Sequence, residues 1–320
     1  MTTLLLDRRD VELCLDNRRV LIREPDSRPR SVPLAMLERV VIQGRARLDT
    51  ALLGALGEQG VDVLLLGARN SRRRGFLAGP GHNDARRRLA QYRLWQDEPR
   101  RLAWSRQLIQ AKTRAQRLRL TRALQRRPDQ RLALTHAIDT LAEIELDLLA
   151  AADRAVVLGL EGSAAAAYFR GYATLFAPAL GFVNRRRRPP PDPVNACLSL
   201  GYTLLHHEAV RACHIAGLDP LLGFYHEPAY GRESLASDLI EPLRPRLDGW
   251  VWWLFRERVL RAELFTEQDA GYRLGKAARG PFFAAYESAA RRWRRYLRLQ
   301  GYRLARALLA QAPELTEDIP

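Results

Sequence analysis

The chain contains 320 residues, of which 47% are hydrophobic, so it is long enough for two domains with packed cores and is not expected to be disordered. Its 52 Lys and Arg residues outnumber its 36 Asp and Glu residues, and the net charge of +16 indicates a polyanionic partner, with nucleic acid favoured over a membrane surface. Apolar runs such as residues 61–66 are far shorter than the roughly 20 residues of a spanning helix. Residues 1–10 lack a signal-peptide core, so we expect a cytoplasmic protein without a membrane segment.

Residues 1–77 are predicted to form a small β-rich domain. Strand-length segments rich in Val, Ile and Leu cover residues 3–6, 11–15, 19–23, 40–42, 61–66 and 75–77. Asp16 and Asn17 predict a hairpin turn, and Asp49 is expected to cap one helix that ends before Gly60. Glycines and a proline at positions 79–81 indicate a flexible linker over residues 78–84.

Residues 85–320 are predicted to form a larger, all-α domain, which makes the expected fold class α+β. Apolar residues recur at helical spacing over residues 86–95, 102–124, 131–157, 163–176, 250–264 and 281–312. Another helix is expected to begin with Asp192 as its cap and Pro193 in its first turn, and to end at Gly217. Pro242 and Pro245 leave the path of the chain after residue 238 open.

The cysteines and the arginine clusters indicate which kinds of binding site the chain is expected to have. Cys14, Cys197 and Cys213 are far apart and form no CxxC pair, so we expect free structural thiols and neither a disulfide nor a zinc site. Most arginine clusters are typical of a solvated helix face. The cluster at residues 185–188 is followed by prolines, which predicts an ordered basic loop able to contact phosphate.

Three segments combine chemically active residue types with small or turn-forming neighbours. Glu161 is flanked by glycines, so another helix is expected to approach it closely, although an acid at a helix start fits the same pattern. His226 lies in GFYHEP, residues 223–228, where a structural histidine is the alternative. Asp238 and Glu241 are expected to point the same way on a helix capped by Ser234, with a solvated acidic face as the alternative.

Glu161, His226 and Asp238 form the candidate metal site. Two carboxylates and one imidazole suit Mg²⁺ or Mn²⁺ and leave positions open for a phosphate oxygen. Such a metal polarises the phosphoryl oxygen of a phosphodiester. The pattern favours a metal-dependent enzyme that acts on DNA, with a stand-alone repair nuclease and a non-catalytic basic DNA-binding protein as alternatives.

Four sequence blocks resemble the CRISPR-associated integrase family of spacer acquisition. They are LEGSAAAAYF (residues 160–169), RRRRPPPDPVNACLSLGYTLL (185–205), GFYHEPAYGRESLASDLIEPLRP (223–245) and, more weakly, LDTALLGALGEQGVDVLLLG (48–67). Their order and separation match the family, and the resemblance covers nearly the whole chain.

This resemblance implies an N-terminal β-domain used for dimerisation and a helical catalytic domain. It implies that Glu161, His226 and Asp238 are the catalytic metal ligands, with Glu227 and Glu241 as secondary acids. The matching blocks also contain residues expected to support the site or contact DNA, namely Tyr168, Arg187, Asn195 and Arg232. Lys112, in the segment IQAKTRAQRLRL, resembles a family position near the DNA.

The implied reaction is the insertion of a short DNA spacer into a CRISPR array. A 3′-hydroxyl of a short duplex attacks a phosphodiester at the repeat boundary, and with water as nucleophile the same site is an endonuclease. The expected partners are DNA, a second copy of the chain in a homodimer, and a dimer of a small ferredoxin-like adaptation protein.

Overall fold

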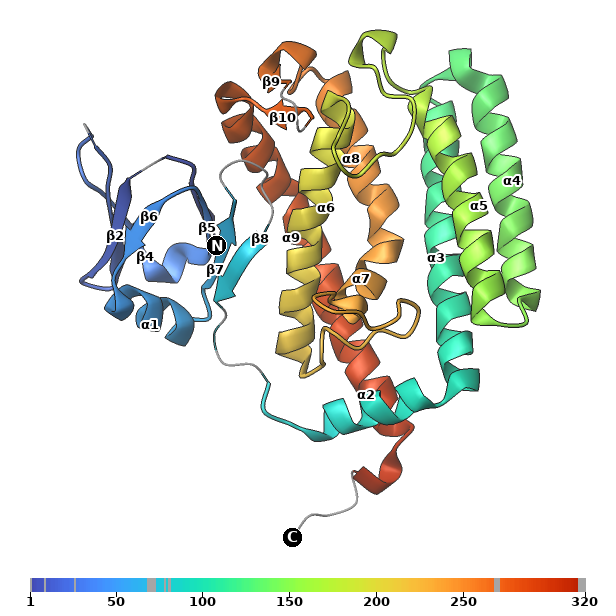
Figure 1. The fold of residues 1–320 in the computed structure, drawn as a ribbon, viewed down its shortest axis with the longest axis horizontal. Helices are drawn as coiled ribbons and strands as arrows, with labels where there is room; N and C mark the ends of the chain where they lie inside the picture. Colours follow the sequence, from blue (N-terminus) through green and yellow to red (C-terminus); the bar gives the residue numbers. More distant parts are fainter. Residues whose placement is uncertain are drawn as a thin grey trace. The chain divides into compact units, whose positions relative to one another are not determined.

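The computed structural model describes residues 2–8, 10–25, 27–67, 73–77, 79, 82–267 and 271–315. The chain divides into two compact units, Met1–His82 and Asn83–Pro320. The first contains most of the strands and the second is mostly helical (Figure 1), so the predicted α+β fold class is confirmed. Of the predicted linker, residues 78, 80 and 81 lie outside the described residues.

The N-terminal unit contains two four-stranded sheets. In the first, β1 (Thr2–Leu6), β5 (Leu37–Gln43) and β7 (Asp62–Leu66) are parallel, and β8 (Arg73–Leu77) is antiparallel to β7. The second has the order β4 (Arg30–Pro33), β3 (Arg19–Arg23), β2 (Val11–Asp16) and β6 (Ala46–Leu48). A 3₁₀ turn, Leu34–Met36, and helix α1 (Thr50–Glu58) complete the unit.

Local sequence explains most of this unit. The β2–β3 hairpin forms as predicted, and its turn residues Asn17 and Arg18 have positive φ angles of 47° and 60°. Asp49 caps α1 as predicted, because its side chain accepts a hydrogen bond from the N–H of Leu52. Strands β4 and β6 were not predicted, since both are short and arginine or proline interrupts their apolar pattern.

The described residues of the C-terminal unit form eight α-helices. They are α2 (Arg86–Gln96), α3 (Glu98–Leu124), α4 (Arg131–Ala150), α5 (Arg154–Ala173), α6 (Pro193–Ala216), α7 (Ser234–Ile240), α8 (Arg244–Arg256) and α9 (Lys276–Ala310). Helix α3 packs against α4 and α5, while α6 packs against α7, α8 and α9. Figure 1 shows α3, α4 and α5 side by side.

Shorter elements connect these helices. The 3₁₀ turns are Pro128–Gln130, Pro178–Leu180, Glu241–Leu243 (η4), Ala262–Leu264 and Pro313–Leu315, and a small two-stranded sheet joins β9 (Phe265–Thr266) to β10 (Arg273–Leu274). Within the described ranges, no helix is both long and apolar enough to cross a membrane. The three cysteines are free, and Cys197 and Cys213 are buried as predicted.

The end of α4 and the start of α5 differ from the sequence prediction, and this changes the position of Glu161. The helix predicted over residues 131–157 is wrong, because the chain breaks after Ala150 and Asp153 caps a new helix by accepting from the N–H of Val156. The apolar periodicity continues across the break and therefore hides it. As a result Glu161 lies two turns inside α5 and is not at a helix start.

The other end of the unit follows the prediction more closely. Asp192 caps α6, accepting from the N–H of Asn195 at 2.7 Å, and Gly217 ends the helix with a φ angle of +75°. Helix α7 ends at Ile240, and η4, which contains Pro242, leads directly into α8. Residue 241 therefore lies in the 3₁₀ turn between α7 and α8.

Candidate active site

A cavity of about 570 Å³ opens in the C-terminal unit. Its walls come from α3, α5, α6, η4 and α8, and from the loops that precede α6 and α7. Its charged lining residues are Lys112, Arg154, Arg185, Arg187, Arg232, Arg244, Glu161, Glu227, Glu241 and Asp248. Cationic groups outnumber carboxylates on this wall, which suits an anionic ligand.

Lys112 occupies the point where three elements of this cavity meet. It lies on the buried face of α3, and its Nζ is 2.7 Å from Oε2 of Glu241 and forms an ion pair with Oε1 of Glu161. The Lys112 side chain is 9% exposed, compared with 22% for Glu161 and 4% for Glu241. Two carboxylates from distant parts of the sequence therefore share one ammonium group.

Glu241 remains ionised although it is buried. Burial on its own raises the pKa of this carboxyl, but the charges of Arg244, Lys112 and His226 outweigh that effect and lower the pKa to about 2. Arg244 contributes directly, because its Nε lies 2.8 Å from Oε1 of Glu241. Both carboxylate oxygens of Glu241 thus face cations.

His226 is held in place by Asp238. Oδ1 of Asp238 lies 2.7 Å from Nδ1 of His226 and also accepts the backbone N–H of that residue at 3.1 Å. Oδ2 accepts the N–H groups of Phe224 and Tyr225 at 2.7 and 3.0 Å. The proton of neutral His226 is therefore assigned to Nδ1, and Nε2, which lies 4.0 Å from Oε1 of Glu241, keeps its lone pair.

The loop that carries His226 packs tightly against α7. A Cβ atom on Gly223 would lie 2.7 Å from the backbone of Ser234 and 2.8 Å from Oδ2 of Asp238, so only glycine fits there. Ser234 does not cap α7 as predicted, because its hydroxyl donates to the carbonyl of Glu227 at 2.9 Å and the N-cap residue is Glu233. This serine ties the loop to the helix.

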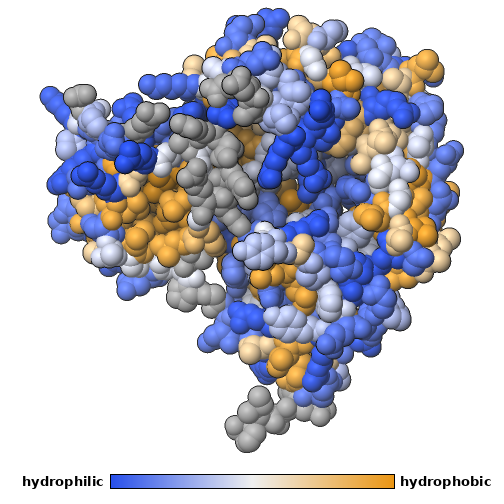
Figure 2. Space-filling view, viewed as in Figure 1, coloured by the Kyte–Doolittle hydropathy of each residue, from blue (hydrophilic) through white to orange (hydrophobic). Residues whose placement is uncertain are grey.

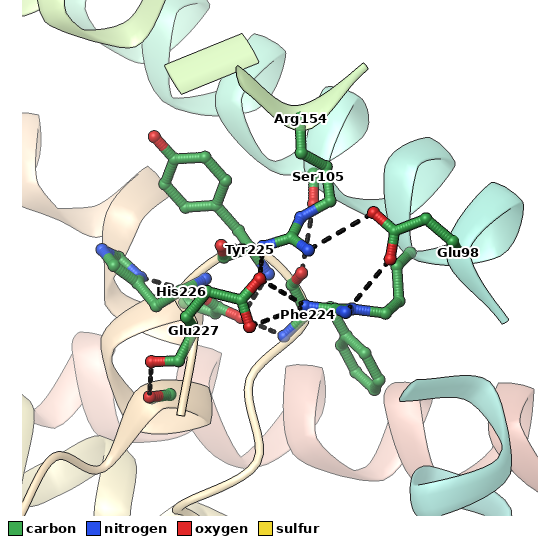
Figure 3. A network of polar contacts seen from close by, with 10 residues as sticks. Glu98, Ser105, Arg154, Phe224, Tyr225, His226 and Glu227 are labelled. Carbon is green, nitrogen blue, oxygen red and sulfur yellow. Dashed lines mark hydrogen bonds and ion pairs between the residues drawn. The ribbon is translucent and has the colours of Figure 1, made fainter. Parts of the chain in front are cut away.

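A network of ion pairs fixes the outer side of the same loop (Figure 3). Glu227 accepts from Arg101 on α3 at 3.1 and 3.2 Å and from Arg154 on α5. Both arginines also contact Glu98, at 3.1 and 3.4 Å. Ser105 of α3 donates to the carbonyl of Phe224 at 3.3 Å. The His226 loop is therefore anchored to α3, α5 and α7 together.

Tyr225 has a hydroxyl group that is buried among the described residues without a hydrogen-bond partner. Its ring lines the cavity, lies 4.9 Å from the His226 ring, and points away from the Glu227 network in Figure 3. Burial, and then the charges of Glu161 and Glu241, raise the pKa of Tyr225 far above its usual value. This hydroxyl therefore stays protonated.

Asp248 also lines the cavity, where tyrosine hydroxyl groups contact its carboxylate. It accepts hydrogen bonds from the hydroxyls of Tyr202 and, at 2.9 Å, Tyr168. The guanidinium groups of Arg185 and Arg244 lie 5.5 and 4.7 Å from the centre of the Tyr202 ring. Burial raises the pKa of Asp248 to about 6, although these hydrogen bonds and charges lower it in part.

The basic loop before α6 is ordered by Asn195. The Asn195 amide oxygen accepts from Arg185 Nη1 at 2.8 Å and from the N–H of Arg186 at 2.9 Å, and its amide nitrogen donates to the carbonyl of Asn184. Arg187, on this loop, and Arg232 are exposed on the cavity wall and form no ion pair with a described carboxylate. Figure 2 shows hydrophilic residues over most of the face in view, with hydrophobic residues in separate patches.

The structure brings only part of the predicted site together. Glu161, His226, Glu241, Lys112, Arg187 and Arg232 all line the cavity. The other three predicted residues do not line it: Asp238, Tyr168 and Asn195 are buried behind it and hold its walls through hydrogen bonds. Helix α3 does approach α5 at Glu161, as predicted, because Lys112 of α3 pairs with this residue. The flanking glycines do not make room for it, since a Cβ on Gly159 or Gly162 would have nothing within 4 Å.

Sequence reasoning missed Arg154, Tyr202, Arg244 and Asp248 as cavity residues. Arg154 follows the unexpected helix break, so nothing in the periodicity marked it. Asp248 lies on the buried face of α8, and Tyr202 and Arg244 are half-buried on α6 and α8. A polar residue at an otherwise apolar helix position, such as Asp248, was the one available signal.

The donor set of the cavity fits a hard divalent cation, although Lys112 stands between its carboxylates. Among the residues that the structure describes, no group of three or more His, Cys, Asp and Glu side chains is arranged to hold a metal. Glu161 and Glu241 supply oxygens and His226 supplies a nitrogen, which are ligand types that Mg²⁺ and Mn²⁺ accept. The positive Lys112 ammonium marks the position where these oxygens already bind a cation.

Comparison with known proteins finds relatives and solved structures similar to nearly the whole chain. The chain is 36% identical over 322 residues to CRISPR-associated endonuclease Cas1 1 of Thermodesulfovibrio yellowstonii, covering 97% of this chain and 98% of the relative. A casposase bound to integration product matches 97% of this chain and 91% of its own with a TM-score of 0.83 at 23% identity. A Cas6-RT-Cas1–Cas2 complex chain matches with a TM-score of 0.82 at 24% identity, covering 97% of this chain and 35% of its own.

The family model described as CRISPR associated protein Cas1 matches residues 4–288, which include most of each unit of the fold and every residue of the cavity described above. The chain therefore belongs to the Cas1 family.

Proposed function

We propose that this protein is a divalent-metal-dependent DNA integrase and endonuclease that inserts short DNA segments into a CRISPR array. The observation that carries the proposal is the pairing of Glu161 and Glu241 with the Lys112 ammonium group in an arginine-lined cavity, with Nε2 of His226 4.0 Å from Oε1 of Glu241. Membership of the Cas1 family supports it, as does similarity to a CRISPR-associated endonuclease and, in fold, to a casposase bound to integration product.

Glu161, His226 and Glu241 are the residues that would hold Mg²⁺ or Mn²⁺. This revises the trio expected from the sequence, because both oxygens of Asp238 accept hydrogen bonds from the loop at residues 224–226. Glu241, by contrast, lines the cavity beside Glu161. When bound, the metal supplies Lewis-acid polarisation of a phosphoryl oxygen.

Asp238 acts as the positioning residue for His226. A carboxylate that accepts Nδ1–H fixes the tautomer and the orientation of the ring, and leaves Nε2 for a ligand in the cavity. The same carboxylate fixes the backbone of the loop through three N–H groups. Asp238 is thus needed for the site without lining it.

Arg187 and Arg232 are the residues that we assign to the DNA backbone. Each is exposed on the cavity wall without an ion-pair partner among the described residues, so its guanidinium is available for a phosphate. Neutralising phosphates in this way releases counterions and makes the binding dependent on salt. Arg185 and Asn195 hold the Arg187 loop in place.

The reaction proposed is transesterification, in which a 3′-hydroxyl of a short duplex attacks a target phosphodiester and displaces a second 3′-hydroxyl. The cationic side chains of the cavity wall orient the phosphate. Glu241 stays ionised, so its carboxylate is available to a metal. We further propose a homodimer and a small ferredoxin-like partner. The Cas1 and Cas2 components named in the matching complex support such a partner.

Strand transfer into supercoiled plasmid that carries a CRISPR repeat tests the proposal. Wild-type protein with its adaptation partner, Mn²⁺ and a short duplex is expected to yield joined products. Glu161→Gln and Glu241→Gln are expected to lose at least about 100-fold in rate, as for removal of a group that acts on the transition state. Lys276→Met, which removes an exposed charge on α9, serves as the control.

Each other outcome identifies a different function. Cleavage without joined product would favour a stand-alone metal nuclease. Binding of the duplex that is indifferent to chelator, with neither cleavage nor joining, would leave a basic DNA-binding protein. Full activity of Glu241→Gln together with an inactive Asp238→Asn would return the third ligand position to Asp238.

A further inference from the structure

Lys112 and the proposed metal require the same carboxylate oxygens. Nζ of Lys112 is 2.7 Å from Oε2 of Glu241 and is ion-paired with Oε1 of Glu161. A divalent cation bound by these two side chains would lie within a few ångströms of the ammonium group. Two positive charges so close repel each other strongly where the Lys112 and Glu241 side chains are buried from solvent. The metal and Lys112 therefore cannot both occupy this position.

Displacing Lys112 has a cost that depends on what else is bound. Its side chain is 9% exposed and lies on the buried face of α3, so an ammonium group that loses both carboxylates lacks water to replace them. A DNA phosphate in the same cavity offers the displaced ammonium a new anionic partner. With DNA bound, moving Lys112 away from the carboxylates therefore costs much less free energy.

We propose that Lys112 couples metal binding to DNA binding by exchanging between the carboxylate pair and a DNA phosphate. In the DNA-free protein the ammonium competes with the metal and keeps Glu161 and Glu241 together. When DNA enters, Lys112 moves to the phosphate and the carboxylates take the metal. Linkage requires the reverse effect as well, so the metal strengthens DNA binding by the same factor. This inference rests on the proposed metal-binding function of the site.

The coupling is measured by titrating Mn²⁺, followed by electron paramagnetic resonance, with and without a duplex that ends in 3′-dideoxynucleotides and so cannot be joined. For wild-type protein we expect the duplex to tighten Mn²⁺ binding by about tenfold or more, within the usual range for coupled sites. Lys112→Met should bind Mn²⁺ about tenfold more tightly than wild type without DNA. With this variant the duplex should change the Mn²⁺ affinity by less than about twofold.

Two further variants keep the experiment decisive. Lys112→Gln retains hydrogen-bond donation to the carboxylates without the charge, and should behave like Lys112→Met even if the methionine variant folds poorly. Lys276→Met removes the only other lysine of the chain, which is exposed on α9, and should keep the wild-type coupling.

The outcomes separate this inference from the function on which it rests. If no variant, wild type included, binds Mn²⁺ with DNA present, the metal site itself is wrong and the coupling falls with it. If wild type binds Mn²⁺ through Glu161 and Glu241, but both Lys112 variants bind it no more tightly than wild type without DNA, the exchange by Lys112 is refuted and the metal site stands.

Discussion

Asp238 and His226 are joined twice, once from carboxylate Oδ1 to the ring Nδ1 at 2.7 Å and once from the same oxygen to the backbone N–H at 3.1 Å. A single carboxylate oxygen therefore fixes both the side chain and the main chain of the histidine. The second oxygen holds the two residues before it. The position of the imidazole thus depends on an acid that lies outside the cavity.

Asp238→Ala is expected to lower the free energy of unfolding by about 2–5 kcal/mol, because buried N–H groups of the loop lose their acceptor at about 1–3 kcal/mol each. Urea denaturation measures the change. Asp139→Ala, at an exposed position of α4, should stay within about 0.5 kcal/mol of wild type. Equal stability of the two variants would contradict the role given to Asp238.

Gly223→Ala is expected to destabilise the protein and to reduce strand transfer together, because the added Cβ collides with the backbone of Ser234 and with Asp238. Backbone shifts of this kind cost about 1–3 kcal/mol. Gly162→Ala is the control, since its Cβ meets nothing within 4 Å and alanine stabilises a helix interior by about 0.5–1 kcal/mol. Thermal unfolding of both variants decides the point, and a Gly223→Ala protein as stable as wild type would show that the loop does not pack as described.

Tyr225→Phe is expected to raise the thermal midpoint by about 2–4 °C. The buried hydroxyl has no hydrogen-bond partner among the described residues, and leaving such a group unsatisfied costs about 1 kcal/mol or more. Tyr296→Phe, at a half-buried tyrosine on α9, is the comparison. A fall in the midpoint for Tyr225→Phe alone would reveal a stabilising partner of this hydroxyl.

Glu227→Gln is expected to slow strand transfer several-fold while changing stability by less than about 1 kcal/mol. The Glu227 side chain is 58% exposed, so its ion pairs with Arg101 and Arg154 are partly screened and contribute little to folding, although they fix the His226 loop. Glu314→Gln removes a similarly exposed ion pair, with Arg93, far along the sequence. If both variants keep wild-type rates, the network has no part in positioning the loop.

Asp248 gives the stability of the protein a recognisable dependence on pH. The pKa of this carboxyl is about 6 in the folded protein and about 4 in an unfolded chain, so between these values only the folded state holds the proton. Stability therefore falls as the pH rises from about 4 to about 6, by up to about 3 kcal/mol from this group. Denaturation across that range should show that the free energies of unfolding of wild type and Asp248→Asn become more similar as the pH falls. A difference that does not change with pH would contradict the raised pKa.

The sequence predicted the fold where one residue decides the local structure. Asp49, Asp192 and Gly217 each fix a helix boundary through their own backbone or side-chain contacts, and all three act as expected. Asp153 acts in the same way, but the apolar pattern that continues through it concealed the break. Capping residues therefore predict a helix boundary only where the apolar periodicity of the sequence also stops.

The candidate site was predicted less completely because its ligands are selected by tertiary packing. Asp238 and Glu241 are three residues apart and both are buried, yet one faces the loop at residues 224–226 and the other faces Lys112. The end of α7 at Ile240 separates their directions. Spacing along an ideal helix could not assign these two acids to different partners.

The ion-pair network at the loop has a consequence for the helices that carry the site. Arg154 precedes Glu161 by seven residues and Arg101 precedes Lys112 by eleven, which are close to two and three whole helical turns, so each arginine lies on the same side of its helix as the site residue. Because Glu227, next to His226, binds both arginines, a rotation of α3 or α5 about its axis would pull on all three elements at once. The ion pairs of Glu227 with Arg101 and Arg154 therefore help to keep Lys112, Glu161 and His226 in their relative positions, although both arginines lie two to three helical turns from Lys112 and Glu161.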